Sequence, residues 1–208
     1  MFTGIVAAIG KIETLTSLGS DADSGVRLHI HAGRLPLVDV QLGDSIAIQG
    51  ACMTVIAKTD THFDVDVSRE SLSKTMGLDK PGEVNLEKAL TLADRLGGHL
   101  VTGHVDGLGE VTVFEAVGES WHLAIRVPGD LAKFFAYKGS VTVNGTSLTV
   151  NQVRDEKSGT EIDINLIPHT LEMTTLKHLK AGVKVNLEID LIARYCERLL
   201  KGSGVLPA

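Results

Sequence analysis

Apolar and polar residues alternate with period two along several short segments of the chain. Residues 26–31, 45–48 and 62–67 follow this pattern, and turn residues such as Gly43-Asp44 and Thr59-Asp60 separate them. Strict alternation over four to eight residues is typical of strands that bury one face. Five or six such strands in about 95 residues, with little helix, predict a small closed β-barrel, because closure removes exposed strand edges.

The same motifs occur twice in the same order, which indicates an internal duplication. Four blocks of the first half, 2–6, 46–55, 63–75 and 84–87, are matched in the second half by 101–105, 141–150, 162–174 and 185–188. The offset stays between 95 and 101 residues. We therefore expect an all-β fold of two tandem barrels, at 1–97 and 98–190, with Gly97-Gly98 as the hinge.

Helical structure is expected in few places. Short helical turns are predicted at 71–76 and 170–176, where Ser and Thr can cap, and 87–96 is a further candidate. The tail, 191–208, places Leu191, Ile192, Tyr195, Leu199 and Leu200 on one helical face after Asp190 at the N-cap position. This stripe either packs on its own barrel or forms an oligomer seam, and we favour the seam because small barrels rarely need an appended helix.

Composition excludes several classes of protein. The net charge of −6 argues against a nucleic-acid surface, and the lack of 18 consecutive apolar residues argues against a membrane span. The first residues lack the features of a signal peptide. Cys52 and Cys196 make no disulfide framework, so we expect a cytoplasmic protein with two free thiols.

Five motifs together resemble the riboflavin synthase family of the trimeric alpha type. They are MFTGIV at 1–6, GACMTV at 50–55, GGHLVTGHV at 97–105, GTSLTV at 145–150 and IPHTLEMTTL at 167–176. The resemblance covers the whole chain, including the tail. It implies two six-stranded antiparallel barrels and a C-terminal helix that mediates trimerisation.

The resemblance also implies an activity. Members of the family convert two molecules of 6,7-dimethyl-8-ribityllumazine into riboflavin and 5-amino-6-(ribitylamino)uracil by transfer of a four-carbon unit. The reaction is a dismutation and needs no cofactor. The implied partners are two further copies of the chain, so that the N-terminal barrel of one faces the C-terminal barrel of the next, and in some members an enclosing lumazine synthase shell.

Site residues are implied for both halves. The N-terminal pocket is expected to contain Gly4, Ile5, Val6, Cys52, Met53, Thr54, Asp66, Val67, Ser68, Arg69, Glu70 and Ser71. The C-terminal pocket is expected to contain Gly103, His104, Val105, Lys138, Ser147, Leu148, Thr149, Asn165, Leu166, Ile167, Pro168, His169 and Thr170. Strand edges and glycines offer backbone groups to a pteridine, and short polar side chains suit a ribityl chain.

The two copies differ where the chemistry would occur. Ile5, Cys52, Asp66 and Glu70 of the first half correspond to His104, Ser147, Asn165 and His169 of the second. The histidines therefore suggest that proton transfer is concentrated in the C-terminal pocket, with His104 as the acid or base. Cys52 or Ser147 could add to the ring or position a water molecule.

Two further catalytic candidates, Ser45 and Asp190, match positions implicated in activity of the family, although Asp190 is equally explained as an N-cap. Some members carry Asp where this chain has Asn144, so no acidic role is expected there. Gly50 and Gly145 are interpreted as turn glycines.

No metal site is expected. His29 and His31 share a strand face, but the neighbouring sequence offers no second pair to complete a ligand set. His99 and His104 fall on opposite faces of a presumed strand.

The alternative function is a non-catalytic antenna protein that holds a lumazine as a fluorescent chromophore. Such proteins share the duplicated fold, but their second pocket decays. In this chain the second half retains Lys138, Ser147 and Thr149, which favours the enzyme.

Overall fold

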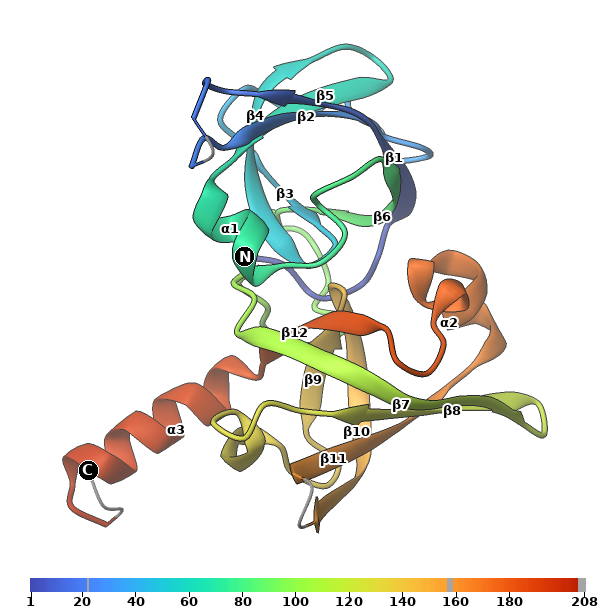
Figure 1. The fold of residues 1–208 in the computed structure, drawn as a ribbon, viewed down its shortest axis with the longest axis vertical. Helices are drawn as coiled ribbons and strands as arrows, with labels where there is room; N and C mark the ends of the chain where they lie inside the picture. Colours follow the sequence, from blue (N-terminus) through green and yellow to red (C-terminus); the bar gives the residue numbers. More distant parts are fainter. Residues whose placement is uncertain (22, 157–158, 206–208) are drawn as a thin grey trace.

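The structure, a computed structural model that describes residues 1–21, 23–156 and 159–205, contains two closed antiparallel barrels stacked along its long axis (Figure 1). The N-terminal barrel has the strand order β1-β2-β5-β4-β3-β6 and the C-terminal barrel β10-β11-β8-β7-β12-β9. These two orders are the same once each strand is matched to its repeat. The predicted all-β fold of two tandem six-stranded barrels is confirmed.

The strands of the barrels include the three segments of period-two alternation, 26–31, 45–48 and 62–67, as predicted. In the N-terminal barrel they are β1 (Ala8–Ser17), β2 (Val26–His31), β3 (Ser45–Ile48), β4 (Ala51–Lys58), β5 (His62–Val67) and β6 (Gly82–Lys88). In the C-terminal barrel they are β7 (Gly107–Val117), β8 (Ser120–Arg126), β9 (Ser140–Val143), β10 (Thr146–Glu156), β11 (Gly159–Leu166) and β12 (Lys184–Ile189). Each barrel encloses its own cluster of buried Val, Ile, Leu and Phe side chains.

The barrels meet at two matching two-residue hairpins. Gln49-Gly50 joins β3 to β4 and Asn144-Gly145 joins β9 to β10, and all four residues have positive φ. Two consecutive residues of positive φ match the right-handed twist of a hairpin. A Cβ on Gly50 would lie 2.7 Å from the Gly145 nitrogen. Both residues are therefore turn glycines, as predicted, and their lack of a side chain also lets the two barrels touch.

Asparagine side chains bond the barrels across this contact. Asn85 Nδ2 donates to the Asn144 carbonyl at 2.8 Å, and Asn186 Nδ2 donates to the Gln49 carbonyl at 2.9 Å. Asn85 and Asn186 occupy matching positions of the repeat, so the two bonds are related by a pseudo-two-fold axis. Asn144 Oδ1 also accepts from the Asn186 backbone at 2.8 Å. Asn144 thus has a structural role in the junction.

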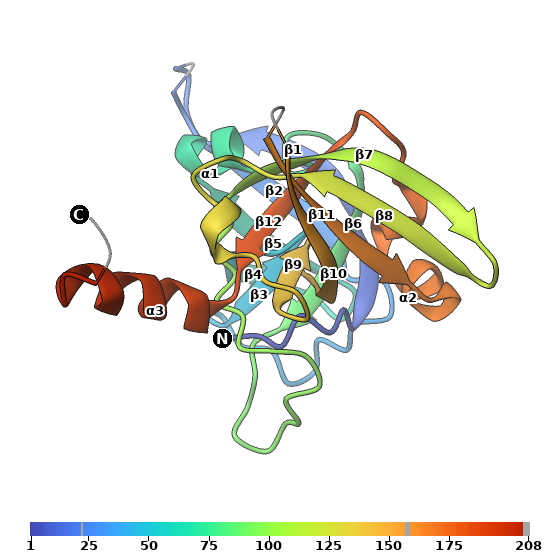
Figure 2. The same ribbon diagram turned by 90° about the horizontal axis from the view of Figure 1, so that it is seen from below.

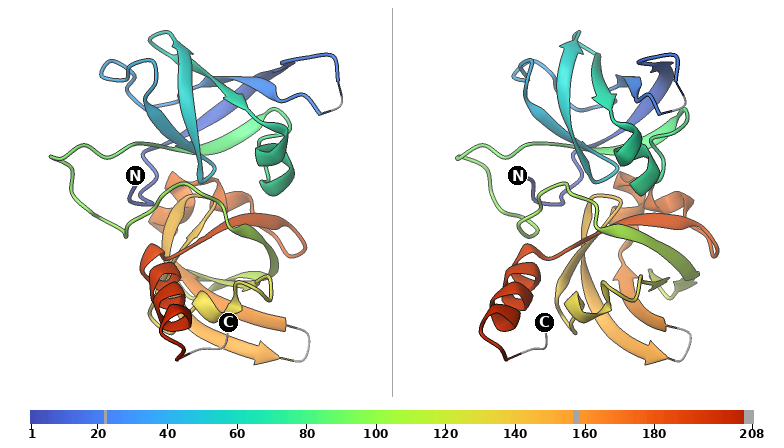
Figure 3. Two further views of the ribbon diagram at one scale, coloured as in Figure 1. Left: turned by 90° about the vertical axis from the view of Figure 1, so that its left-hand side faces the viewer. Right: turned by 60° about the vertical axis from the view of Figure 1, so that its left-hand side comes forward.

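The short helices begin slightly earlier than predicted. They are α1 (Arg69–Lys74), η1 (Ala132–Phe134), α2 (Pro168–Met173) and η2 (Thr175–His178). The helix expected over 87–96 is wrong, because residues 87–88 end β6 and residues 89–96 form a loop. The Leu90 and Ala89 amides bond to the Met1 and Ser45 carbonyls. These contacts to other segments replace helical hydrogen bonds, and Figure 3 shows the green linker projecting beside the N-terminus.

The C-terminal helix α3 (Leu191–Gly202) projects to one side of the molecule (Figure 2). Its charged side faces its own barrel, where Arg194 pairs with Asp106 and Glu197 pairs with Lys133. Ile192, Tyr195 and Leu199 point away and are 64%, 62% and 70% exposed. These three residues of the stripe therefore do not pack on their own barrel, whereas Leu191 is partly buried and Leu200 borders a hollow with Phe134 and Phe135. Residues 206–208 of the predicted tail lie outside the described residues. Among the residues that the structure describes, no helix is long and apolar enough to span a membrane.

Candidate functional site

Polar side chains form a matching strip on the outer face of each barrel. In the N-terminal barrel the strip contains Cys52 and Thr54 of β4 with Asp66 of β5. In the C-terminal barrel Ser147, Thr149 and Asn165 occupy the matching positions of β10 and β11. We call these the N-terminal and C-terminal half-sites. The outward direction follows from alternation, since the intervening Val55 and Val150 point into the barrel cores.

Each half-site is completed by a segment of the opposite repeat. The Cys52 amide donates to the Gly103 carbonyl at 2.8 Å, and the Ser147 amide donates to the Gly4 carbonyl at 2.7 Å. Val105 also packs against the core of the N-terminal barrel. Residues 103–105 therefore belong to the N-terminal half-site and Gly4 to the C-terminal one. The assignment of these two segments in the sequence analysis is wrong, because each segment crosses the junction to pair with the other barrel.

Two buried carboxylates fix the crossing segments. Glu87 at the end of β6 accepts from the Thr3 amide and hydroxyl, both at 2.7 Å, and from the Gly4 amide at 3.0 Å. Glu188 at the end of β12 accepts from the Thr102 amide and hydroxyl at 2.7 Å and from the Gly103 amide at 2.9 Å. Burial raises the pKa of both carboxyls, and the three donors oppose that shift. Each glutamate thus positions the segment that completes the other barrel's half-site.

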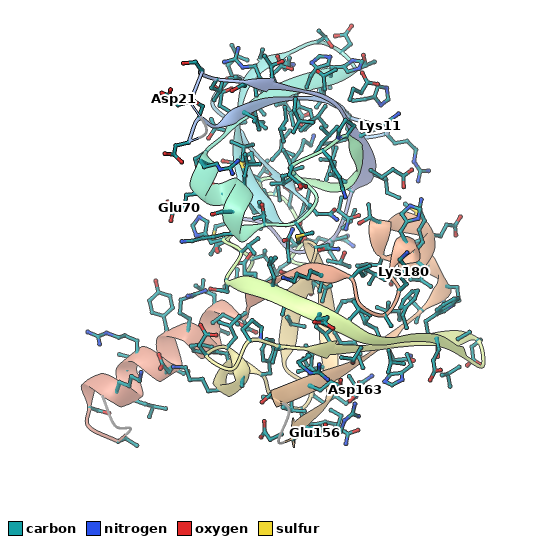
Figure 4. All side chains as sticks on the ribbon, in the orientation of Figure 1. Lys11, Asp21, Glu70, Glu156, Asp163 and Lys180 are labelled. Atoms are coloured by element: carbon teal, nitrogen blue, oxygen red, sulfur yellow. The ribbon has the colours of Figure 1, made fainter. Side chains whose placement is uncertain are left out.

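A hollow of about 200 Å³ lies at the N-terminal half-site. It is bounded by residues of β4, of α1 and of the crossing segment, namely Ala51, Cys52, Met53, Glu70, Ser71, Lys74, Thr75, Gly103, His104 and Val105. Glu70 lies on α1 (Figure 4). It pairs with Lys74 at 2.7 Å. The histidine of the second repeat therefore stands beside the cysteine of the first. The hypothesis that proton-transferring groups gather in the C-terminal pocket is wrong for His104.

The C-terminal half-site has its own histidine. His99 Nδ1 lies 2.7 Å from Ser147 Oγ, and its ring is almost fully buried. His99 Nε2 has no hydrogen-bond partner among the described residues. Burial lowers the pKa of His99, so its imidazole is neutral at neutral pH and can accept the hydroxyl proton of Ser147. A histidine within hydrogen-bonding distance of a serine is an arrangement that activates a nucleophile or positions a water molecule.

Replacing His99 with Gln should change how stability depends on pH. The unfolded His99 takes up a proton as the pH falls below its ordinary pKa of 6.5, whereas the buried ring resists protonation. Acidification below that value therefore destabilises the wild type through this residue. We expect the gap in unfolding free energy between wild type and His99→Gln to narrow from about pH 7.5 to about pH 5.5 in urea titrations. A gap independent of pH would contradict the buried, neutral state of His99.

Several predicted lining residues offer no side chain to a ligand. Val67 and Leu166 are 0% and 1% exposed and point into the barrel cores, so only their backbones are available. Ser68 caps α1 by accepting from the Ser71 amide at 3.1 Å. The helix residues Arg69, Glu70 and Ser71 match Pro168, His169 and Thr170 of α2. Leu148 packs against the C-terminal core, while Ile167 is exposed.

The charged candidates have partners of their own. Asp66 receives two hydrogen bonds from Arg27, at 2.8 and 3.0 Å, which lower the pKa of the carboxyl. Asn165 accepts from Ser120 at 2.9 Å instead. Lys138 donates to Asn151 at 3.0 Å from a backbone of positive φ. Asp190 caps α3 by accepting from the Ile192 amide at 2.9 Å, which supports its structural explanation.

Ser45 and Ile5 lie at a different hollow from the half-sites. This hollow of about 580 Å³ is bounded by β3, β6 and the linker and also includes Glu87 and Lys88. Ser45 pairs with Thr54 in the β3–β4 ladder. The largest of the described hollows is therefore next to the N-terminal half-site and does not contain Cys52. We place the candidate site at the half-sites, because both repeats build them in the same way.

Sequence reasoning missed three residues of the site: Glu87, Glu188 and His99. The repeated Val-Asn-Leu-Glu motif was a sufficient signal for the two glutamates, since a charged residue at the end of both matching strands needs a partner. The third residue, His99, is missed because a strand over residues 99–104 would place it on the opposite face from His104. Only Val101 makes a ladder contact in that segment, a single bridge to Phe2, so alternation does not apply there.

Comparison with known proteins agrees with this repeat. The lumazine binding domain family matches residues 3–89 and again residues 102–190. The riboflavin synthase of Photobacterium phosphoreum is 46% identical over 96% of this chain and 89% of its own length. The riboflavin synthase of Brucella abortus (strain 2308) is 43% identical over 96% and 98% of the two chains. LumP complexed with riboflavin has a similar structure, with a TM-score of 0.75 and 26% identity over 91% of this chain and 99% of its own.

Proposed function

Because this chain belongs to the lumazine binding domain family, which matches both of its halves, we propose that it is a riboflavin synthase. The proposed reaction transfers a four-carbon unit between two molecules of 6,7-dimethyl-8-ribityllumazine and yields riboflavin and 5-amino-6-(ribitylamino)uracil. It is a dismutation, so it needs no cofactor. The observation that carries the proposal is the presence of two half-sites built in the same way, one with Cys52 and His104 at the same hollow and the other with Ser147 beside His99. Donor and acceptor are the same compound, and two copies of one site suit that requirement.

The polar groups that the reaction needs are distributed between the two half-sites. We infer that Cys52 and His104 serve the lumazine at the N-terminal half-site, and that Ser147 and His99 serve the one at the C-terminal half-site. One group must add a nucleophile at C7 of one ring, and another must remove a proton from the C7 methyl of the other. His99 accepts the Ser147 proton as that hydroxyl, or a water molecule beside it, attacks the ring. Thr54 and Thr149 are suited to bonding the ribityl hydroxyls.

We propose that the working form is a cytoplasmic homotrimer. Both half-sites lie on outer faces of the barrels, so a single chain leaves one face of each bound lumazine open. A neighbouring chain that brings its C-terminal half-site against the N-terminal one would stack the two rings and exclude water. Holding two reactants in that arrangement supplies the entropic part of catalysis. The exposed apolar stripe of α3 supports such an assembly, and an enclosing lumazine synthase shell is a further possible partner.

The proposal is tested by incubating the purified chain with 6,7-dimethyl-8-ribityllumazine alone. We expect riboflavin to form without added cofactor, one molecule for every two lumazines consumed, as measured by absorbance and chromatography. Tight binding with stable lumazine fluorescence and no riboflavin would contradict the enzyme and support an antenna protein. Equilibrium dialysis separates the two outcomes independently, because two lumazines per chain are expected for the enzyme and one for the antenna.

A further inference from the structure

A group of imidazoles and carboxylates lies on the outer face of the N-terminal barrel, on three strands that lie side by side (Figure 1). Glu13 of β1, His29 of β2 and His62 of β5 have potential ligand atoms within 4.8 Å of one another. On its own strand His29 has only His31 for a neighbour of this kind, whereas Glu13, His62 and Asp64 approach it from neighbouring strands.

From these contacts we propose that Glu13, His29 and His62 bind a divalent first-row transition metal, such as zinc. Two imidazoles and one carboxylate are a ligand set that these cations prefer, with a fourth position left for water. The site would tie β1, β2 and β5 together. It is separate from the proposed lumazine sites, so neither proposal depends on the other.

The Nδ1 atom of each ring has a hydrogen-bond partner, which leaves Nε2 as the candidate ligand atom. His29 Nδ1 lies 2.6 Å from Asp64 Oδ1, and His62 Nδ1 lies 2.9 Å from Thr61 Oγ1. Carboxylates and hydroxyls in these positions orient a metal-binding histidine and fix its tautomer. The Nε2 atom of each ring is thereby free of a backbone partner. His62 Nε2 already lies 3.3 Å from Glu13 Oε2.

Glu13 lies at a β-bulge on this face. The register of β1 against β2 shifts between Ile12 and Thr14, so Glu13 is the extra residue. Ile12 is fully buried in the core, so strand alternation directs the next side chain outward, and the bulge affects only where Glu13 sits along the strand beside His62. Metal-binding residues on three strands are therefore brought together by the ladder itself.

The second repeat shows how the same positions are neutralised without a metal. There Arg154 bridges Glu161 and Asp163, and it contacts the nearer Glu161 oxygen at 2.5 Å. Figure 4 labels Asp163 on the C-terminal barrel. In the first repeat Glu161 and Asp163 correspond to His62 and Asp64, and Thr59 stands in place of Arg154. The first repeat thus lacks the guanidinium, and an imidazole replaces one of the two carboxylates.

The rings must move a short distance to bind an ion. His29 and His62 are stacked with their centroids 4.8 Å apart and their planes within 3°. In a tetrahedral zinc site two ligand nitrogens lie about 3.3 Å apart. The His29 side chain is 43% exposed, and its ring must turn out of the stack, with adjustment of its 2.6 Å contact to Asp64, to bring a nitrogen into range.

The test is a zinc titration against a chromophoric chelator, using the intact chain. We expect one zinc per chain at micromolar concentration, and at least a tenfold weaker affinity for His62→Gln, since a lost ligand costs at least as much as a lost supporting group. His122→Gln is the matched control. His122 also contacts a carboxylate, Asp163, on an outer barrel face, but it has no second imidazole beside it.

Cobalt(II) identifies the ligands, because Cys52 and Cys196 could also bind metals. We expect a visible spectrum without the near-ultraviolet band of a cobalt–thiolate bond. Zinc should also raise the melting temperature of the wild type and leave that of His62→Gln unchanged. Unchanged zinc affinity of His62→Gln, a thiolate band, or no zinc binding below millimolar concentration would overturn the proposal.

Discussion

Replacing Glu188 with Ala should open the N-terminal half-site, although Glu188 belongs to the C-terminal barrel. The substitution leaves the Thr102 amide and hydroxyl and the Gly103 amide without their acceptor. Each buried donor left unpaired costs about 1–3 kcal/mol. We expect a loss of about 3 kcal/mol in unfolding free energy after water enters, and release of residues 103–105 from Cys52. Lumazine affinity at that half-site should fall about tenfold or more.

The reporter for this prediction is the alkylation rate of Cys52, measured in a Cys196→Ser background. Glu87→Ala is the matched control, because Glu87 makes the same three hydrogen bonds to Thr3 and Gly4. Both variants should lose similar stability, but only Glu188→Ala should expose Cys52 to the reagent. Faster alkylation in Glu87→Ala than in Glu188→Ala would contradict the crossing of the two segments.

Placing charges on the apolar stripe of α3 should separate the chains. Ile192→Asp with Leu199→Asp changes two side chains that are 64% and 70% exposed and touch little of their own barrel. A buried, unpaired carboxylate in an oligomer seam is strongly unfavourable. We expect the proposed trimer to dissociate in sedimentation equilibrium, with unchanged circular dichroism. Riboflavin formation should fall about a hundredfold, because the two lumazines are no longer held against each other.

Arg198→Asp is the control for this pair, since it changes charge at an exposed residue of the same helix without removing an apolar side chain. It should leave the sedimentation behaviour and the activity close to those of the wild type. A monomeric wild type with full activity would show that the stripe serves another purpose. A trimer that survives both aspartates would place the seam elsewhere on the molecule.

The barrels could be predicted from the sequence because alternation reports directly on which side of a strand is buried. Leu28 and Ile30 are fully buried between the outward Arg27, His29 and His31, as the pattern requires. The linker could not be predicted in the same way. Its apolar residues suggest a helix, but its amides bond to residues distant in the sequence, and Thr91 is held by Asp94 in a local turn.

The repeat predicts which residues of the two halves match but not how the half-sites are assembled. The repeat matches Gly4 with Gly103 and Cys52 with Ser147. It does not say whether each glycine segment contacts the barrel of its own half or that of the other half. The segments that contain Gly4 and Gly103 offer the same backbone hydrogen bonds to either barrel. Only the path of the chain therefore determines which barrel each segment contacts. The three-strand group around His62 was missed for a related reason, because cross-strand neighbours such as Glu13 depend on a bulge that the sequence does not reveal.

The crossing of residues 2–6 and 101–105 also constrains how the two copies can diverge. Each half-site is a composite of both repeats, so a substitution at residue 104 alters the surroundings of Cys52 in the other copy. A change in one repeat must then be tolerated by the partner repeat from the moment it arises. Duplicated domains usually gain independence after the duplication, whereas these two remain tied to a shared history, and neither can be inherited, exchanged or lost without the other.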